Sequence, residues 1–196
     1  LLDGDALESF QRTVADLVEP ALERLGWRPA EPETQLDAQL RGLLVQLWAL
    51  VGRDQSAIDR CRELFALVLD APDMIDPDLA AAVTVVAAAT GDDDTYEIFL
   101  DRFRRATTPQ ETLRFLYGLA EFDDEEHLRR TCETAFGPEV KTQNAPFLLG
   151  RCITARRHGR VAWRVLRSRW NEADTAPEPP AQRSGAGTFS ARMSSR

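Results

Sequence analysis

Apolar residues recur along most of this chain at intervals of three or four positions, the spacing that places them on one face of an α-helix. The clearest stripe begins at Leu36 and ends at Val51, directly before Gly52. Each stripe is expected to be the buried face of its helix. The pattern predicts helices over residues 7–25, 36–51, 54–69, 76–89, 96–103, 108–120, 125–136, 144–153 and 161–170.

Short breaks of one kind separate several of these helices. In each break a glycine or an aromatic residue stands beside acidic residues, and the next helix begins at once; the breaks are residues 51–54, 90–93, 121–124 and, more loosely, 157–160. Helix pairs that recur at a rough period are typical of a stacked helical array. No segment shows the alternation and β-branched enrichment of a strand. The sequence therefore predicts an all-α fold of about nine helices in antiparallel pairs.

Polar residues and prolines mark where several helices begin. Asp54 can cap one helix, and Asp76 with Pro77 gives another a capping acceptor and a pre-set φ in its first turn. Residues 108–111, Thr-Pro-Gln-Glu, match a capping box. The alanine-rich helix that follows Asp76 carries little bulk, so neighbouring helices can approach it closely. We therefore place it in the middle of the array.

The first helix contains a proline and ends at a glycine. Pro20 is expected to kink it near Val18 or to end a first segment there. Gly26 suits the left-handed position that follows a helix, and Pro29 prevents the helix from continuing.

The composition changes beyond Asn171, where proline, glycine and serine replace the apolar periodicity. We predict a helical-repeat domain over residues 1–171 and a disordered tail over residues 172–196. Because the first residue is Leu1 rather than methionine and stands just before a helix, we expect the chain to be a fragment of a longer polypeptide.

The net charge of −8 disfavours a nucleic-acid partner, since binding a phosphate backbone requires a concentrated basic face. Arginines gather in residues 151–169, among apolar residues, and we interpret them as the solvated side of two amphipathic helices. An all-α transcription regulator would need a basic helix-turn-helix near its amino end, whereas residues 1–26 are mainly acidic. No apolar stretch approaches the roughly 20 residues of a membrane span. We therefore expect neither a nucleic-acid nor a membrane partner.

The three cysteines, Cys61, Cys132 and Cys152, form no Cys-x-x-Cys pair and fall on apolar faces. We interpret them as small core residues in a reduced, cytoplasmic setting. His127 and His158 stand far apart in the sequence, so they do not form the two-histidine helical motif of a zinc hydrolase.

No nucleophile elbow and no phosphate-cradling glycine motif occurs in the chain. The acidic runs at residues 92–94 and 123–126 stand at helix starts, where carboxylates cap the helix, and they lack the alternating ligands of a calcium loop. The residues alone therefore predict no catalytic residue, no metal ligand and no cofactor in this segment.

An ordered set of segments runs from about Leu7 to Trp170. The segments are Leu25-Gly26-Trp27, the helix of Leu36, Leu40 and Arg41, the breaks at Gly52 and Gly91, residues 140–146 (Val-Lys-Thr-Gln-Asn-Ala-Pro), and Trp163 with Trp170 on the last long helix. Taken in this order, they resemble the C-terminal helical domain of the aminopeptidase N family of zinc aminopeptidases. The chain has neither the His-Glu-x-x-His helix nor the Gly-x-Met-x-Asn segment of that family.

The resemblance implies a HEAT-like superhelix folded over a separate thermolysin-like domain that holds the zinc. In that family the array closes a chamber over the active site, admits peptides and excludes folded proteins. We therefore expect a non-catalytic lid of a parent zinc metallo-aminopeptidase, with zinc bound in the parent enzyme and none in this segment. The expected partners are the upstream catalytic domain of the same polypeptide and a peptide substrate. The alternative is a free-standing helical-repeat scaffold that binds a protein or peptide, and the residues alone do not separate the two.

Two features depart from the family. Asn144 stands where family members usually have aspartate; it can still cap the helix that begins there, but it cannot form the same charged contact. The tail beyond Asn171 does not resemble the family's last helices.

Three residues near the start of the eighth helix are candidate substrate contacts. Lys141, Gln143 and Arg151 could face the chamber, where a cation would suit a peptide carboxylate. The competing interpretation is that all three face solvent.

Overall fold

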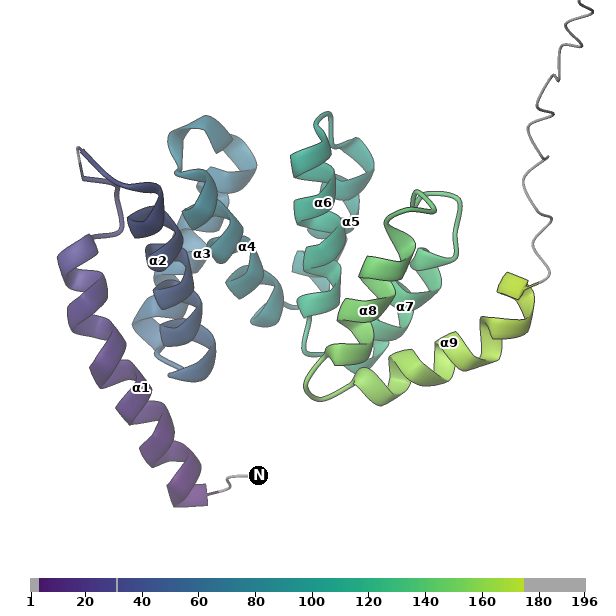
Figure 1. The fold of residues 1–196 in the computed structure, drawn as a ribbon, viewed down its shortest axis with the longest axis horizontal. Coiled ribbons are helices and arrows are strands. Elements are labelled where there is room, and N and C mark those ends of the chain that lie inside the picture. Colours follow the sequence, from purple (N-terminus) through teal and green to yellow (C-terminus); the bar gives the residue numbers. More distant parts are fainter. Residues whose placement is uncertain (1–3, 31, 175–196) are drawn as a thin grey trace, which may run out of the picture.

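The computed structural model describes residues 4–30 and 32–174, and these residues form nine α-helices and no strand. The all-α prediction is confirmed (Figure 1). The helices are α1 (Gly4–Leu25), α2 (Gln35–Gln46), α3 (Gln55–Asp70), α4 (Pro77–Ala89), α5 (Asp93–Arg105), α6 (Pro109–Gly118), α7 (Glu125–Ala135), α8 (Ala145–Thr154) and α9 (Gly159–Asp174). Three short turns accompany them: the wide π-helical turn η1 (Leu47–Val51), and the 3-10 turns η2 (Pro72–Met74) and η3 (Leu119–Glu121).

The helices stack in two layers. α2, α4, α6 and α8 contact one another in turn and form one layer, and α3, α5 and α7 lie behind it (Figure 1). α1 packs on α2 at one end of the row, and α9 packs on α7 and α8 at the other end. Because every second helix belongs to the front layer, α2, α4, α6 and α8 run in the same direction. Their C-terminal ends therefore lie along one edge of the molecule.

The alanine-rich helix α4 lies inside the row, as predicted, and packs against α2, α3 and α6. Its small side chains allow a close approach. A Cβ atom placed on Gly42 of α2 would lie 3.2 Å from the carbonyl oxygen of Asp78 and 3.6 Å from the Cβ atom of Ala82. A larger residue at either position would push the two helices apart.

Aspartates cap four of the helices, which confirms that the acidic runs start helices. Each carboxylate accepts hydrogen bonds of 2.8 to 3.0 Å from backbone N–H groups in the first turn of its helix. The capping residues are Asp54 of α3, Asp76 of α4, Asp92 of α5 and Asp124 of α7.

The starts of α6 and α8 differ from the predictions. The hydroxyl oxygen of Thr108 accepts a hydrogen bond of 3.2 Å from the backbone N–H of Glu111. The Glu111 carboxylate, however, accepts a hydrogen bond from the backbone N–H of Thr107 rather than from that of Thr108. The reciprocal bond of the capping box is therefore displaced by one residue. Asn144 has a helical backbone, with φ −92° and ψ −24°, and its side chain makes no capping bond. The predicted cap at Asn144 is wrong because a cap side chain reaches the first-turn amides from an extended backbone.

α1 continues through Pro20 to Leu25, so the predicted end near Val18 is wrong. Pro20 is exposed, and water can reach the carbonyl that its missing N–H leaves unpaired. Gly26 has φ +71°, which confirms the left-handed position after the helix. At the other end of the chain, α9 extends to Asp174, and residues 175–196 of the predicted tail lie outside the described residues.

The apolar stripe from Leu36 to Val51 was expected to be buried; this is confirmed for Trp48 and wrong for four of the leucines. Leu36, Leu40, Leu43 and Leu47 are 76%, 42%, 60% and 42% exposed. The buried face lies on the opposite side of the helix and consists of Ala38, Arg41, Gly42 and Val45. The close contact with α4 requires small residues, and positions 38 and 42 supply them. Large apolar side chains are exposed on the end helices too, namely Leu7, Phe10 and Leu17 of α1 and Trp163 and Trp170 of α9.

Aromatic side chains form the centre of the core. The Phe99 ring packs 5.3 to 5.4 Å from the rings of Phe65, Phe115 and Phe122, which joins α3, α5 and α6. His127 is buried beside this cluster, stacked 4.3 Å from the Tyr96 ring, with its Nε2 atom 3.0 Å from the Asp93 carboxylate. His127 therefore packs as an aromatic ring between α5 and α7.

Candidate functional site

A cleft of about 870 Å³ lies at the edge where the front-layer helices end. Its volume falls in the range of small-molecule and peptide sites. Its walls come from α1, from the ends of α2 and α4, from η3, and from the turn between α8 and α9. The lining residues are Leu7, Phe10, Gln11, Leu43, Gln46, Leu47, Leu50, Val51, Arg53, Ala89, Ala120, Glu121, Phe122, Asp123, Ala155, Arg156, Arg157 and His158.

One side of the cleft is apolar. Leu7 and Phe10 project from α1, and Leu43 and Leu47 project from α2 and η1. These four side chains are all more than one-third exposed, so they offer apolar surface that a ligand could cover. This wall has no charged side chain and suits apolar groups of a ligand.

The other side of the cleft is charged. Asp123 forms an ion pair with Arg157 at 3.2 Å, and the Nε2 atom of His158 lies 3.8 Å from the same carboxylate. Glu121 is held in the same way by Arg151, at 3.1 Å. The two acids of the cleft therefore have basic partners from α8 and the turn that follows it.

Two arginines of the cleft have no such partner. No described carboxylate lies within ion-pair distance of Arg53 or Arg156. They belong to different turns, Arg53 between η1 and α3 and Arg156 between α8 and α9. Arg53 is held at φ +56°, a left-handed backbone that an arginine rarely adopts. Backbone strain of this kind is concentrated at functional sites.

The backbone itself gives part of the reason for these basic residues. The C-terminal ends of α2, α4, α6 and α8 approach the cleft, and a helix C-terminus carries a partial negative charge that favours cations. The partial negative charge of a helix C-terminus is smaller than the full positive charge of an arginine, so the helix ends balance only part of the charge of Arg53 and Arg156. The cleft thus combines an apolar wall with two guanidinium groups free to bind an anion.

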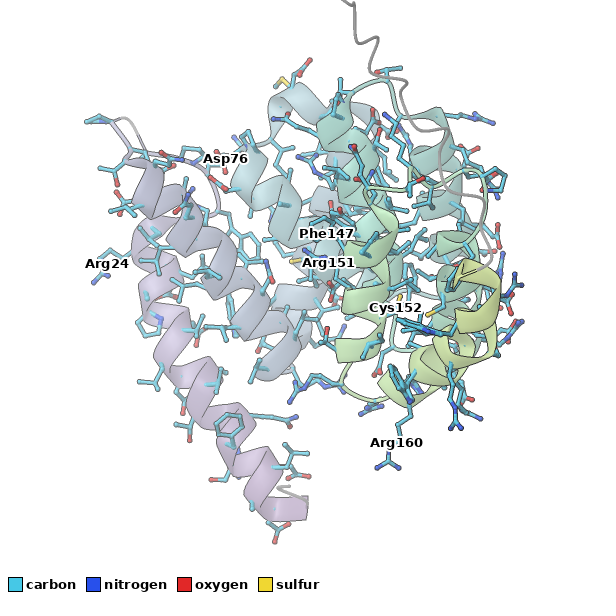
Figure 2. The ribbon with its side chains drawn as sticks, turned by 45° about the vertical axis from the view of Figure 1, so that its right-hand side comes forward. Arg24, Asp76, Phe147, Arg151, Cys152 and Arg160 are labelled. Carbon is cyan, nitrogen blue, oxygen red and sulfur yellow. The ribbon has the colours of Figure 1, made fainter. Side chains whose placement is uncertain are left out.

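The three predicted substrate contacts lie in different places. Lys141 and Gln143 are exposed in the segment that precedes α8, whereas the cleft lies beyond the other end of that helix. A helix of ten residues is about 15 Å long. Arg151 lies nearer the cleft, because it pairs with the lining residue Glu121 and stacks 4.9 Å from the Tyr117 ring. Figure 2 shows Arg151 one turn from Phe147 on α8.

The sequence analysis missed Arg53 and Arg156 and the apolar wall of the cleft. A signal for the cleft was nevertheless present in the repeated breaks. Residues of the breaks 51–54, 121–124 and 157–160 line it, and the lining residue Ala89 directly precedes the remaining break, residues 90–93. Breaks that end alternate helices of a two-layered array gather at the same edge, so their recurrence marks where a shared surface forms.

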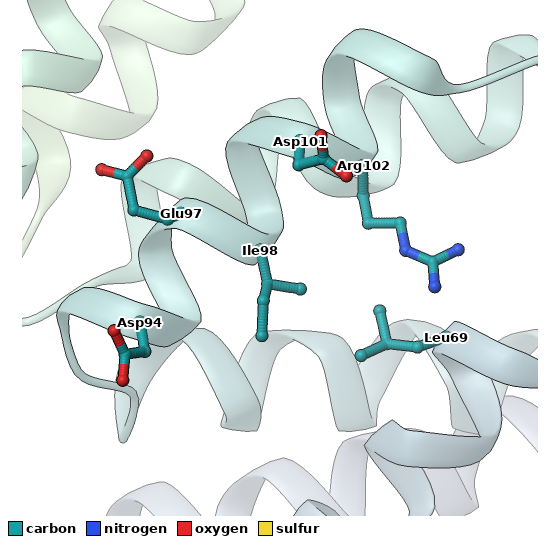
Figure 3. Close-up of a pocket in the computed structure, with 6 residues that line it drawn as sticks. All are labelled: Leu69, Asp94, Glu97, Ile98, Asp101 and Arg102. Carbon is teal, nitrogen blue, oxygen red and sulfur yellow. The ribbon is translucent and has the colours of Figure 1, made fainter.

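A second hollow, of about 450 Å³, lies between the end of α3 and α5 (Figure 3). Leu69 and Ile98 form its floor, and Asp94, Glu97, Asp101 and Arg102 stand around it. Glu97 pairs with Arg130 at 2.7 Å, and Asp101 pairs with Arg105 at 2.9 Å. Over residues 4–30 and 32–174, no group of three or more His, Cys, Asp or Glu side chains is placed to hold a metal ion. This hollow is therefore a surface feature in which two of the three acids are ion-paired.

The cysteines are buried, as the sequence predicts. Burial raises the pKa of the Cys61 thiol to about 12. A hydrogen bond with Cys132, together with burial, raises the pKa of Cys152. Because all three thiols are buried and out of reach of most reagents, the three side chains act as core residues.

None of the helices within the described part of the chain is both long and apolar enough to cross a membrane.

These features define a class: a helical-array domain that presents a binding cleft at the edge where its alternate helices end. Residues 1–195 match the family described as the ERAP1-like C-terminal domain, and the chain belongs to that family. It is 30% identical over 171 residues to aminopeptidase M1-A of Oryza sativa subsp. japonica, a match that covers 85% of this chain and 19% of that protein.

Two further relatives give the same result. Aminopeptidase M1 of Arabidopsis thaliana is 31% identical over 151 residues, which is 75% of this chain and 17% of that protein. Aminopeptidase M1-C of Oryza sativa subsp. japonica is 27% identical over 180 residues, which is 89% of this chain and 20% of that protein. The chain thus spans about a fifth of the length of the relatives that it matches.

Proposed function

We propose that this chain is the non-catalytic C-terminal lid of a zinc metallo-aminopeptidase that removes N-terminal residues from peptides. The lid, a HEAT-like array, closes a substrate chamber over an active site in the upstream catalytic domain of the same polypeptide, which we call the parent enzyme. The names of the relatives and the family match support this proposal. The described residues offer no cluster suited to zinc, so the proposal assigns the zinc to the upstream domain.

The cleft is the observation that carries the proposal. Its apolar wall can hold side chains of a peptide, and Arg53 and Arg156, which line the same cleft, can bind a carboxylate. An aminopeptidase acts at the N-terminus of its substrate. A surface that binds the distal part of the peptide would therefore orient the substrate without touching the reacting bond.

A lid contributes to catalysis without catalytic groups. Closing the chamber excludes water from the reaction and limits which substrates can enter. Lys141, Gln143 and Arg151 remain proposed substrate contacts. Arg151 is the best placed of the three, and its pairing with Glu121 leaves it less free to bind a carboxylate than Arg53 or Arg156.

The test uses the parent enzyme with Arg53→Asn and Arg156→Ala combined. Asparagine is chosen at position 53 because it tolerates the left-handed backbone. For peptides with a free C-terminal carboxylate, KM should rise about tenfold, the factor that corresponds to about 1.4 kcal/mol. KM for the same peptides with a C-terminal amide, and for an aminoacyl-arylamide, should stay unchanged.

The matched control replaces Arg62 and Arg105 by alanine; both are exposed arginines on α3 and α5, outside the cleft. Unchanged KM for every peptide in the Arg53/Arg156 variant would reject the binding role of the cleft. The purified segment of residues 1–196 provides the second arm. It should bind no zinc stoichiometrically and hydrolyse no aminoacyl-arylamide, and zinc-dependent turnover by this segment would reject the lid assignment.

A further inference from the structure

The four leucines of α2 and η1 form one continuous exposed stripe, here called the leucine face: Leu36, Leu40, Leu43 and Leu47. Their spacing of four, three and four residues keeps them on one side of the helix, over a length of about 16 Å. The buried contacts of α2 are made by its other side, so nothing within the described residues requires leucine at these positions. Exposed apolar stripes of this kind mark interaction surfaces.

The leucine face is also free of charge. The only charged residues from Gln35 to Val51 are Asp37 and Arg41. Asp37 is used at the start of the helix, where it bonds to Thr34, and Arg41 is fully buried and bonds to Glu33. The exposed polar side chains beside the leucines are glutamines. In a chain with 29% charged residues, this depletion is typical of the centre of a permanent interface.

The two ends of the leucine face differ in their surroundings. Leu43 and Leu47 also line the cleft, together with Leu7 and Phe10 of α1. Leu36 and Leu40 lie outside the cleft, toward the start of α2. A peptide held in the cleft therefore cannot account for the most exposed leucine of the stripe, Leu36.

We propose that the Leu36 and Leu40 end of the leucine face packs against an apolar, uncharged surface of the upstream part of the parent enzyme, while Leu43 and Leu47 remain part of the cleft. Relatives have about four-fifths of their length outside the region matched here, so ample polypeptide is present to cover the face. Its occupant presents apolar side chains at helical or alternating spacing and no charge, because a charge placed against the leucines would lose its water. This contact fixes the position of the cleft relative to the upstream domain. The inference rests on the proposed function only in treating the chain as part of a longer polypeptide.

The test is hydroxyl-radical footprinting of the parent enzyme, read by mass spectrometry, with the labelling rate of each leucine normalised to its rate in urea. Leu67 of α3 is the matched control, because it is 41% exposed and Leu40 is 42% exposed. Leu36 and Leu40 should be labelled at least fivefold more slowly than Leu67. Equal normalised rates for Leu40 and Leu67 would overturn the inference.

Two other occupants are recognised in the same experiment. Protection that disappears on dilution would identify a second copy of the chain, and protection that appears only with added peptide would identify the substrate; either result overturns the inference. A second measurement uses Leu36→Gln with Leu40→Gln in the parent enzyme, with Leu67→Gln as control. The double variant should lower the thermal unfolding temperature by several degrees more than the control, and equal shifts would count against the inference.

Aminopeptidase activity measured on the same preparation separates the two proposals. Protected leucines in a parent protein without aminopeptidase activity would leave the packing inference standing and reject the proposed function. An active enzyme with freely labelled leucines would leave the proposed function standing and reject the packing inference.

Discussion

Arg41 of α2 is fully buried and forms a two-pronged ion pair with Glu33, with an Nη1–Oε2 distance of 3.1 Å. Its Nε atom also donates to the carbonyl oxygen of Gly26 at 2.8 Å. The guanidinium thereby joins three elements: the end of α1, the segment that leads into α2, and α2 itself. One side chain fixes how α1 docks on the row, and so it fixes one wall of the cleft.

Arg41→Ala should therefore destabilise the chain by about 3 to 5 kcal/mol, because it leaves the Glu33 carboxylate partly buried and unpaired. Urea unfolding followed by circular dichroism measures the change. Arg41→Lys should also be destabilising, since an ammonium cannot reproduce the planar fork. The exposed pair of Arg60 and Glu63 provides the control, and Arg60→Ala should change stability by less than about 1 kcal/mol. A similar small effect at Arg41 would contradict its assigned role.

Gly118, at the end of α6, should not tolerate a methyl group. A Cβ atom there would lie 2.4 Å from Cε1 of Phe99, whose ring is held by the aromatic cluster. Gly118→Ala should cost about 1 to 3 kcal/mol through overpacking. Gly150 of α8 is the matched control, because nothing lies within 4 Å of its added Cβ atom. Gly150→Ala should stabilise the chain by about 0.5 to 1 kcal/mol, and the two opposite signs can be read from thermal unfolding.

Acid should weaken the starts of α5 and α7. Hydrogen bonds from Thr95 lower the pKa of the Asp92 carboxyl, and the backbone N–H of His127 lowers the pKa of Asp124. Because the folded pKa is below the unfolded value of about 3.9, this stabilisation is present above that pH and is lost as the pH falls through the folded pKa. Urea unfolding between pH 7 and pH 2 should show stability falling over this acid range. Asp92→Asn with Asp124→Asn should flatten the fall, and an unchanged slope would exclude these caps as its cause.

The three thiols should be unreactive in the folded chain. At pH 8, a disulfide reagent such as DTNB should label none of Cys61, Cys132 or Cys152 within minutes, because burial keeps these thiols protonated or out of reach. All three should react once urea unfolds the chain. Rapid labelling without denaturant would show that α7 and α8, which carry Cys132 and Cys152, open readily.

The sequence predicts the helices well because each is encoded locally. The 3.6-residue period and the aspartates that precede α3 and α4 act within a few residues of where they stand, so no tertiary information is needed. The resemblance to a family was recognised for a similar reason: Leu25-Gly26-Trp27 and Arg41 lie in order along the chain, and the structure brings Gly26 and Arg41 together.

The orientation of the helices about their own axes was not predictable in the same way. The spacing of an apolar stripe does not show whether the stripe faces the core of the domain or an interface with a partner. Because leucine is usually buried, the sequence favours the core for the stripe of α2. The deciding information lay in Gly42, which permits close contact with α4 on the opposite side of α2. The cleft was missed because Arg53 and Arg156 are about a hundred residues apart in the sequence and line the same cleft only through the stacking of the helices.

Because alternate helices end at one edge, the residues along that edge and the residues along the opposite rim can change independently in evolution. Residues 51–54, 121–124 and 157–160 can vary in length or charge and reshape the cleft while the helices that bear them keep their packing. The opposite rim, which carries Lys141 and Gln143, can change without altering what the cleft accepts. The shape and charge of such a cleft can therefore diversify through a few loop residues, and sequence comparisons restricted to the helices would overlook this variation.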